Sequence, residues 1–107
     1  MKDINLPQLK GSEKQIALAE KIRSALFNTY SSIESDIIAT NQNGAVLQPY
    51  RAMFESIESA SYYIDNRVNG NDKLSFIEFV KSFIAYSQEK GIAHLDREKM
   101  EIHYDTI

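Results

Sequence analysis

The stretch GSEKQIALAEKIR, from Gly11 to Arg23, decides the fold, because a helix start signal and the beginning of an apolar stripe coincide in it. Ser12 is a good N-cap, since its hydroxyl can accept a hydrogen bond from an amide of the first turn, and Gln15 can reach back to the Ser12 amide. Glu13 suits the positive end of the helix dipole. The stretch therefore predicts a helix that starts at Ser12.

The apolar residues that follow recur at intervals of three and four, which places them on one face of a helix. That face consists of Ile16, Ala19, Ile22, Leu26, Tyr30, Ile33 and Ile37. Since no Gly or Pro interrupts residues 12–43, we predict one long first helix to about Thr40, roughly 40 Å in length at ~1.5 Å per residue. The alternative is a break at 28–32, because Asn, Thr and Ser favour caps and turns over helix interiors.

Arg23 projects from within this apolar stripe, where an arginine needs a partner. One interpretation is that its stem packs while its guanidinium reaches water or a carboxylate, and the other is a cation that faces a ligand. A second helix antiparallel to the first would bring Asp65 level with Arg23, because the two residues lie about equally far from the intervening turn. We therefore predict an Arg23 to Asp65 ion pair, in which Asn66 can take part, that sets the register of the two helices.

Size and composition narrow the class of protein. The chain has 107 residues, 43% of them hydrophobic and 25% charged, which is ordinary for a single helical domain spanning residues 1–107. It has no cysteine, so disulfides and cysteine-ligated zinc are excluded. Its net charge of −3 argues against a dedicated duplex-DNA binder. No apolar run approaches the ~20 residues that span a bilayer, and no signal peptide is recognisable, so we expect a cytoplasmic protein without membrane contact.

Turn signals divide the rest of the chain. Residues 1–11 contain Leu6-Pro7 and no helical period, so we expect an N-terminal strap that leads into the first helix. A turn at 41–44 ends that helix. The second helix has Pro49 in its first turn, where the missing amide costs nothing, and its apolar period runs to about 65–69.

A third helix follows the turn at 69–72, with Ser75 as its N-cap, Glu78 completing a second capping box, and Gly91 ending it. Its apolar residues are too many for a narrow stripe, so we expect it to be the most buried helix. Residues 92–107 form either a short fourth helix around 96–102 or an extended tail. The predicted fold class is all-α, a small bundle of three to four helices with a long first helix and a buried third helix.

The segment RVNGNDKLSFIE, Arg67 to Glu78, resembles the loop of EF-hand calcium sites, with Asn69, Asn71, Ser75 and Glu78 at ligand positions. Arg67 stands where the family has its first aspartate, although calcium needs hard oxygen donors. A frame that starts two residues earlier places a phenylalanine at the last ligand position. The competing interpretation is a turn that runs into a capping box, with no metal and no other cofactor.

A second resemblance covers about a fifth of the chain. The stretch GSEKQIALAEKIR at residues 11–23, together with SASYYIDNR at residues 59–67, resembles the motifs of a family of small domains from phages and other mobile elements. The motifs of that family read GSEKQIAWAxxIR, preceded by a Leu-Pro-x-Leu strap, and SAKWWIDNR. The chain has the strap at residues 6–9, but it has Leu18, Tyr62 and Tyr63 where the family has tryptophan. The resemblance implies a phage or mobile-element origin and, by analogy alone, an anti-CRISPR-like inhibitor.

We expect no enzyme, because the sequence shows no nucleophile beside a base, no paired carboxylates in an apolar setting and no glycine-rich phosphate loop. The only histidines, His94 and His103, stand nine residues apart in the charged C-terminal segment, without the spacing of metal ligands. No catalytic residue and no metal ligand is therefore assigned.

The leading hypothesis is a non-enzymatic inhibitor or adaptor that binds and occludes a host protein. That host protein would belong to a defence system or to nucleic-acid processing and would have a basic surface. The expected contact residues are Glu34, Asp36, Glu55 and Glu58. The alternative is an accessory protein that binds nucleic acid through a basic surface. Its contact residues would be Lys10, Lys14, Lys21 and Arg67. A degenerate EF-hand calcium module is the third hypothesis, and the oligomeric state is left open.

Overall fold

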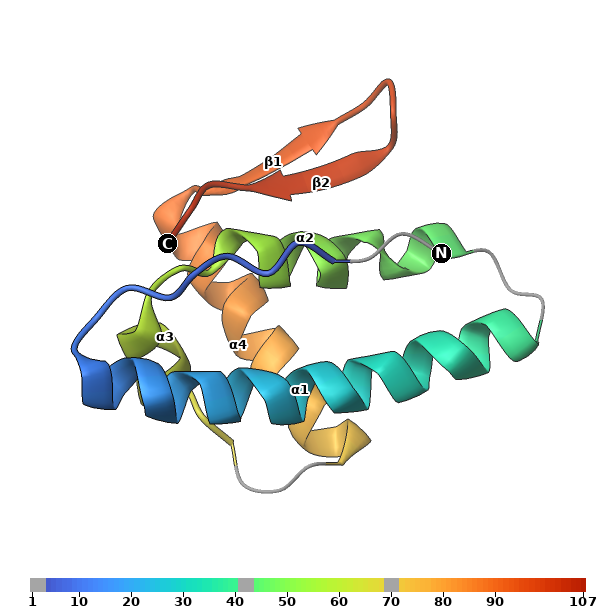
Figure 1. The fold of residues 1–107 in the computed structure, drawn as a ribbon. Coiled ribbons are helices and arrows are strands. Elements are labelled where there is room, and N and C mark those ends of the chain that lie inside the picture. Colours follow the sequence, from blue (N-terminus) through green and yellow to red (C-terminus); the bar gives the residue numbers. More distant parts are fainter. Residues whose placement is uncertain (1–3, 41–43, 69–71) are drawn as a thin grey trace.

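A computed structural model describes residues 4–40, 44–68 and 72–107. The elements, in chain order, are helix α1 (Glu13–Ala39), the 3-10 helix η1 (Gly44–Leu47), helices α2 (Gln48–Ser56), α3 (Ala60–Asp65) and α4 (Lys73–Lys90), and strands β1 (Ala93–Asp96) and β2 (Glu101–Tyr104). Figure 1 shows α1 along one side, α4 crossing behind it, and the two strands stacked beyond α2. The fold is mostly helical with one small antiparallel sheet, so the all-α prediction holds only in part.

The start of α1 is confirmed. The Ser12 hydroxyl accepts a hydrogen bond from the Gln15 amide at 3.2 Å, and the Ser12 amide donates to Gln15 Oε1 at 3.0 Å. The helix then continues without interruption to Ala39, so the alternative break at 28–32 does not occur. Within that segment, the Thr29 hydroxyl donates to the Ala25 carbonyl inside the helix rather than ending it.

The single second helix is a wrong prediction, because the chain divides it into α2 and α3. Pro49 does lie in the first turn of α2, but that helix ends at Ser56. The backbone that follows pairs with distant segments instead: the Glu58 carbonyl accepts from the Lys10 amide at 2.7 Å, and the Glu58 amide donates to the Ile107 carbonyl at 2.7 Å. Ser59 then caps α3. Backbone pairing with two other parts of the chain thus overrides the local helical period.

Helix α4 is the predicted third helix, with a different start. Asp72 is its N-cap, because the Ser75 amide donates to Asp72 Oδ1 at 2.7 Å, and this bond lowers the pKa of the Asp72 carboxyl. Ser75 lies inside the first turn and is buried, so its assignment as the cap was wrong. Gly91 ends the helix in the left-handed conformation, with φ of 66°, as predicted.

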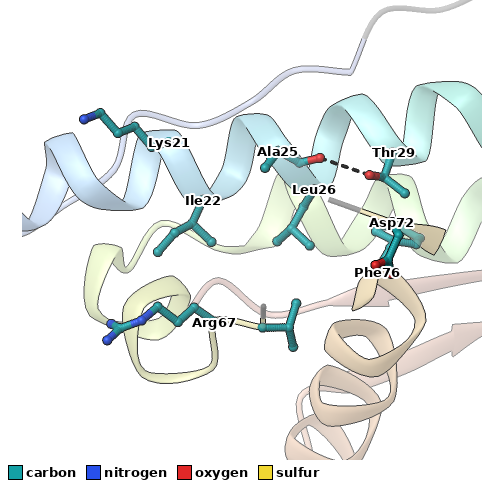
Figure 2. Close-up of a pocket in the computed structure, with 9 residues that line it drawn as sticks. Lys21, Ile22, Ala25, Leu26, Thr29, Arg67, Asp72 and Phe76 are labelled. Atoms are coloured by element: carbon teal, nitrogen blue, oxygen red, sulfur yellow. Dashed lines mark hydrogen bonds between the residues drawn. The ribbon is translucent and has the colours of Figure 1, made fainter. Parts of the chain in front are cut away.

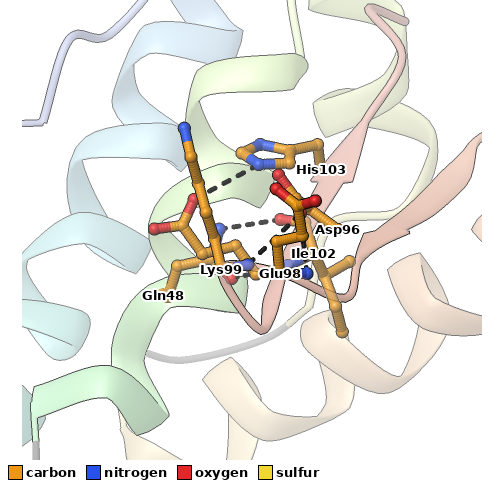
Figure 3. A network of polar contacts seen from close by, with 7 residues as sticks. Gln48, Asp96, Glu98, Lys99, Ile102 and His103 are labelled. Atoms are coloured by element: carbon orange, nitrogen blue, oxygen red, sulfur yellow. Dashed lines mark hydrogen bonds and ion pairs between the residues drawn. The ribbon is translucent and has the colours of Figure 1, made fainter.

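Residues 92–107 form a β-hairpin, neither the short helix nor the extended tail that we predicted. Strands β1 and β2 pair antiparallel, with His94 opposite His103. Asp96 Oδ1 accepts from the backbone amides of Glu98 and Lys99 and so stabilises the turn. Figure 3 shows how Gln48 of α2 holds β2 by two hydrogen bonds to the Ile102 backbone, of 2.7 and 2.9 Å.

An aromatic core joins the helices. Tyr30 of α1, Phe54 of α2 and Phe76 of α4 meet with ring centroids 5.7 to 6.2 Å apart. Tyr63 of α3 stacks on Phe79 of α4, with centroids 5.7 Å apart. The strap contributes Leu9, which is buried. Of the turns predicted at 41–44 and 69–72, residues 41–43 and 69–71 lie outside the described residues.

Candidate interaction surfaces

The structure does not form the predicted ion pair between Arg23 and Asp65. Arg23 Nη1 donates to the Pro7 carbonyl at 2.6 Å, and Asp65 is exposed at the end of α3. The strap crosses α1 at this point and offers the guanidinium a backbone acceptor, whereas the division of the second helix redirects α3. Arg23 therefore anchors the strap, which is a structural role, and the Asn66 amide donates to the Tyr62 carbonyl instead.

The acidic residues predicted to bind a partner do not form one surface. Glu34 is nearly buried, and its Oε2 accepts from the Tyr30 hydroxyl at 2.7 Å and from Arg51 Nη1 at 2.8 Å. Asp36 pairs with Lys73 of α4.

Glu58 pairs with Lys10 of the strap at 2.9 Å, so a third predicted partner-binding carboxylate also faces a cation of its own chain. Glu55 of α2 is exposed and takes part in none of these three ion pairs. Three of the four carboxylates, Glu34, Asp36 and Glu58, thus join separate parts of this chain to one another.

Two of the four basic residues of the nucleic-acid hypothesis meet at one pocket. Lys21 of α1 and Arg67, which follows α3, line a cavity of about 200 Å³ together with apolar side chains such as Leu26 and Phe76. In Figure 2 Lys21 and Arg67 both lie on the side opposite Asp72, but the Lys21 ammonium points away from Arg67. Lys14 is exposed in the first turn of α1, seven residues before Lys21 and therefore on the same helix face. Lys10 is separate, since it pairs with Glu58.

The side of α4 that faces away from the core carries exposed apolar residues. Leu74 is 67% exposed, Ile77 44% and Ile84 43%, although Phe76, Phe79 and Phe83 of the same helix are buried. Glu78 and Lys81 are exposed among them. We call these five residues the outer face of α4: Leu74, Ile77, Glu78, Lys81 and Ile84. The expectation that this is the most buried helix holds only in part, because α4 has six buried residues, more than any other described helix, but only one of its sides reaches the core.

Half-buried residues of α1 extend the outer face of α4. Ile33 and Ile37 line a shallow depression with Ile77, and Asp36 and Lys73 close one side of it as an ion pair. The sequence held a signal for the outer face that we did not use: at ~100° per residue, Leu74 and Ile77 project on the side opposite Phe79 and Phe83. The number of apolar residues alone does not distinguish the two sides of the helix, whereas their angular positions around the helix axis do.

The residues of the EF-hand resemblance are only partly placed, since Asn69 and Asn71 lie outside the described residues. Ser75 is buried in the first turn of α4, and Glu78 is exposed on the outer face. Across residues 4–40, 44–68 and 72–107, no group of three or more His, Cys, Asp or Glu side chains could hold a metal ion. The histidines lie on the hairpin, where each is within 3.3 Å of a carboxylate oxygen.

Two tyrosine hydroxyls, those of Tyr62 and Tyr63, are buried without a hydrogen-bond partner. They stand where the phage-domain motif has its paired tryptophans. Burial raises the pKa of Tyr62 to about 12 and also raises that of Tyr63, since a phenolate is disfavoured away from water. Both rings pack on α4, so these residues belong to the core rather than to an exposed binding surface.

In comparisons with protein-family models, with curated proteins and with solved structures, no match to this chain was found. Within the described part of the chain, no helix has both the length and the apolar character needed to cross a membrane.

Proposed function

We propose that the protein is a non-enzymatic interaction module that binds another protein through the outer face of α4. We further propose that it acts in the cytoplasm as an inhibitor or adaptor from a phage or other mobile element, occluding a host protein of a defence system or of nucleic-acid processing. The motif resemblance alone supports this origin and target class. The exposed apolar side of α4 supports the mode of binding.

The outer face of α4 carries the proposal. Large apolar side chains grouped on the surface of a folded protein mark interaction sites more often than isolated ones do. Full burial of a leucine or isoleucine side chain contributes about 1.5–3 kcal/mol, so Leu74, Ile77 and Ile84 together supply a substantial driving force for association. The helix that presents them is held by its opposite side in the core, so little ordering is needed on binding.

The acidic surface is a weaker candidate for the same function. A basic partner would have to compete with Arg51 for Glu34, with Lys73 for Asp36 and with Lys10 for Glu58. Breaking the pair at Glu34 is costly, because its side chain is only 13% exposed. We therefore assign recognition to the outer face of α4 and leave Glu55 as a residue that can assist electrostatic approach.

The test is capture of the partner from nuclease-treated bacterial lysate by tagged protein, with mass spectrometry as the readout. The variant Ile77→Glu/Ile84→Glu removes the apolar character of the outer face, and Leu95→Glu on β1 is the matched control, since Leu95 is also exposed. We expect one stoichiometric partner with the wild type and with Leu95→Glu, and none with the double variant. Capture that survives in the double variant contradicts the assignment, provided all three proteins have the same circular dichroism spectrum.

Nucleic-acid binding is the second candidate function. The observation that favours it is the position of Lys14 and Lys21 on one face of α1, with Arg67 across the pocket. No carboxylate pairs with these three cations among the residues that the structure describes.

Fluorescence anisotropy with single-stranded and duplex oligonucleotides tests this candidate. If it holds, the affinity falls steeply with salt and is lost in Lys14→Glu/Lys21→Glu, whereas Lys90→Glu binds normally. Binding that is absent at low salt eliminates it.

A further inference from the structure

The outer face of α4 is arranged symmetrically about the middle of the helix. The sequence midpoint of Glu78 and Lys81 lies between Phe79 and Val80. The sequence midpoint of Ile77 and Ile84 lies one residue further along the helix. Leu74 and Ala85, both exposed, share the first of these centres. Three pairs of residues are thus related by nearly the same midpoint.

We propose that a second copy of this chain occupies the outer face, with its α4 antiparallel to the first and a two-fold axis that crosses the outer face at the level of Val80 along the helix. A two-fold interface is self-complementary, so every contact in it occurs twice. In this register Ile77 of each copy lies opposite Ile84 of the other, and Leu74 lies opposite Ala85. The inference rests on the proposed function of the outer face as a protein-binding surface and adds a second copy of this chain as an occupant, so that self-association and binding of a host protein compete for the same face.

Charge complementarity selects a second copy as the occupant. Glu78 and Lys81 are both exposed, and neither makes an ion pair in the described part of the chain. In the antiparallel register, Glu78 of each copy lies opposite Lys81 of the other, which gives two ion pairs beside the apolar contacts. A parallel arrangement of the same helices instead opposes Glu78 to Glu78 and Lys81 to Lys81, so like charges disfavour it.

The neighbouring surface extends this contact. Ile33 and Ile37 of α1 border the outer face at Ile77 and are only half-buried, so a second copy can cover them as well. The interface remains that of one helix pair and its border, at the small end of specific protein interfaces. The dimer is therefore expected to be reversible and to form with increasing protein concentration.

Sedimentation velocity of the purified chain over a wide range of concentration tests the dimer and its register. Glu78→Lys alone and Lys81→Glu alone each place like charges opposite one another twice, so both variants should sediment as monomers. The double variant Glu78→Lys/Lys81→Glu restores opposite charges and should recover the dimer. The controls Glu55→Lys and Lys14→Glu make the same changes of charge away from α4 and should sediment as the wild type does.

Cysteine cross-linking tests the antiparallel direction. Because the chain has no native cysteine, an introduced cysteine is the only thiol that can form a disulfide. When chains carrying Ile77→Cys and chains carrying Ile84→Cys are mixed and oxidised, they should form covalent dimers. Neither variant should do so alone, because residues 77 of the two copies lie about 10 Å apart along the helix at ~1.5 Å per residue, beyond the reach of a disulfide.

Two results overturn the inference: a wild-type chain that is monomeric at all concentrations, or covalent dimers formed by each cysteine variant alone. Either result leaves the proposed function open to its own test, in which Ile77→Glu/Ile84→Glu is compared with the wild type for capture of a different protein. If that capture is lost in the double variant, the outer face binds a different protein and only the inference about a second copy fails.

Discussion

On one side of α4, Phe76, Phe79 and Phe83 are at most 2% exposed, whereas on the other side Leu74, Ile77 and Ile84 are between 43% and 67% exposed. The two sides have similar apolar content and differ in what covers them. The inner side packs against rings from α1, α2 and α3, and the outer side meets solvent in the isolated chain. Apolar content alone therefore does not separate a core helix from a helix that also presents a binding surface.

The largest loss of stability is expected for a substitution on the inner side of α4. Phe79→Ala should reduce the free energy of unfolding by about 3–5 kcal/mol, because it leaves a cavity between the stacked ring of Tyr63 and the rest of the core. Chemical denaturation measures the loss. Ile77→Ala on the outer side is the matched control and should cost less than ~1 kcal/mol. Equal losses for the two variants would show that the outer side is also covered in the isolated chain.

A smaller effect, of opposite sign, is expected at the ring that packs on Phe79. Tyr63→Phe removes a buried hydroxyl without a partner, so it should raise the free energy of unfolding by about 1 kcal/mol. Tyr30→Phe is the matched change where the hydroxyl does donate, to Glu34 at 2.7 Å, and it should lower stability by about 1 kcal/mol. Thermal denaturation of both variants decides the point, and a loss of stability in Tyr63→Phe contradicts it.

The start of α4 should show a smaller, pH-dependent effect. Its hydrogen bonds to the first turn lower the pKa of Asp72 in the folded state. The carboxylate therefore contributes stability that is complete above its ordinary pKa and is lost as the pH falls through the lowered one. Asp72→Asn keeps an acceptor oxygen and cannot titrate. Urea denaturation across the acidic range should show the wild-type advantage over Asp72→Asn shrinking as the pH falls, and a constant difference would exclude the link.

The smallest effect on stability is expected on the outer side. Ile84→Glu should change the free energy of unfolding by no more than ~0.5 kcal/mol, since Ile84 is already 43% exposed. The same substitution should weaken self-association in sedimentation experiments. A strong loss of stability that does not depend on protein concentration would instead make Ile84 part of the core.

Local signals account for what could be predicted about the fold. The capping box at Ser12, the period of α1 and the stop at Gly91 depend on hydrogen bonds and side chains within a few residues, and all three are present. The N-cap of α4 was misplaced by three residues, because Asp72 and Ser75 both have cap chemistry and only one of them lies at the end of the helix.

The candidate site was less predictable, because its residues were identified by type rather than by their surroundings. Glu34 has the chemistry of a surface carboxylate, but Tyr30 and Arg51 surround it in the structure. Lys21 and Arg67 are far apart in sequence and line one pocket. The outer face of α4 could have been found from the phase of Leu74 and Ile77, which is opposite to that of Phe79.

The sequence by itself determined the long first helix, the helix that ends at Gly91 and the mostly helical class, since each follows from contacts between near neighbours in the chain. Only the tertiary structure decided the division at 57–59, the hairpin of residues 92–107 and the acceptor of Arg23. The first and the last depend on backbone groups distant in sequence, those of Lys10 and Ile107 for Glu58 and that of Pro7 for Arg23. The hairpin is held by the side chain of Gln48, which is also distant in sequence. No local pattern encodes such pairing, because its free energy exists only once the chain has folded.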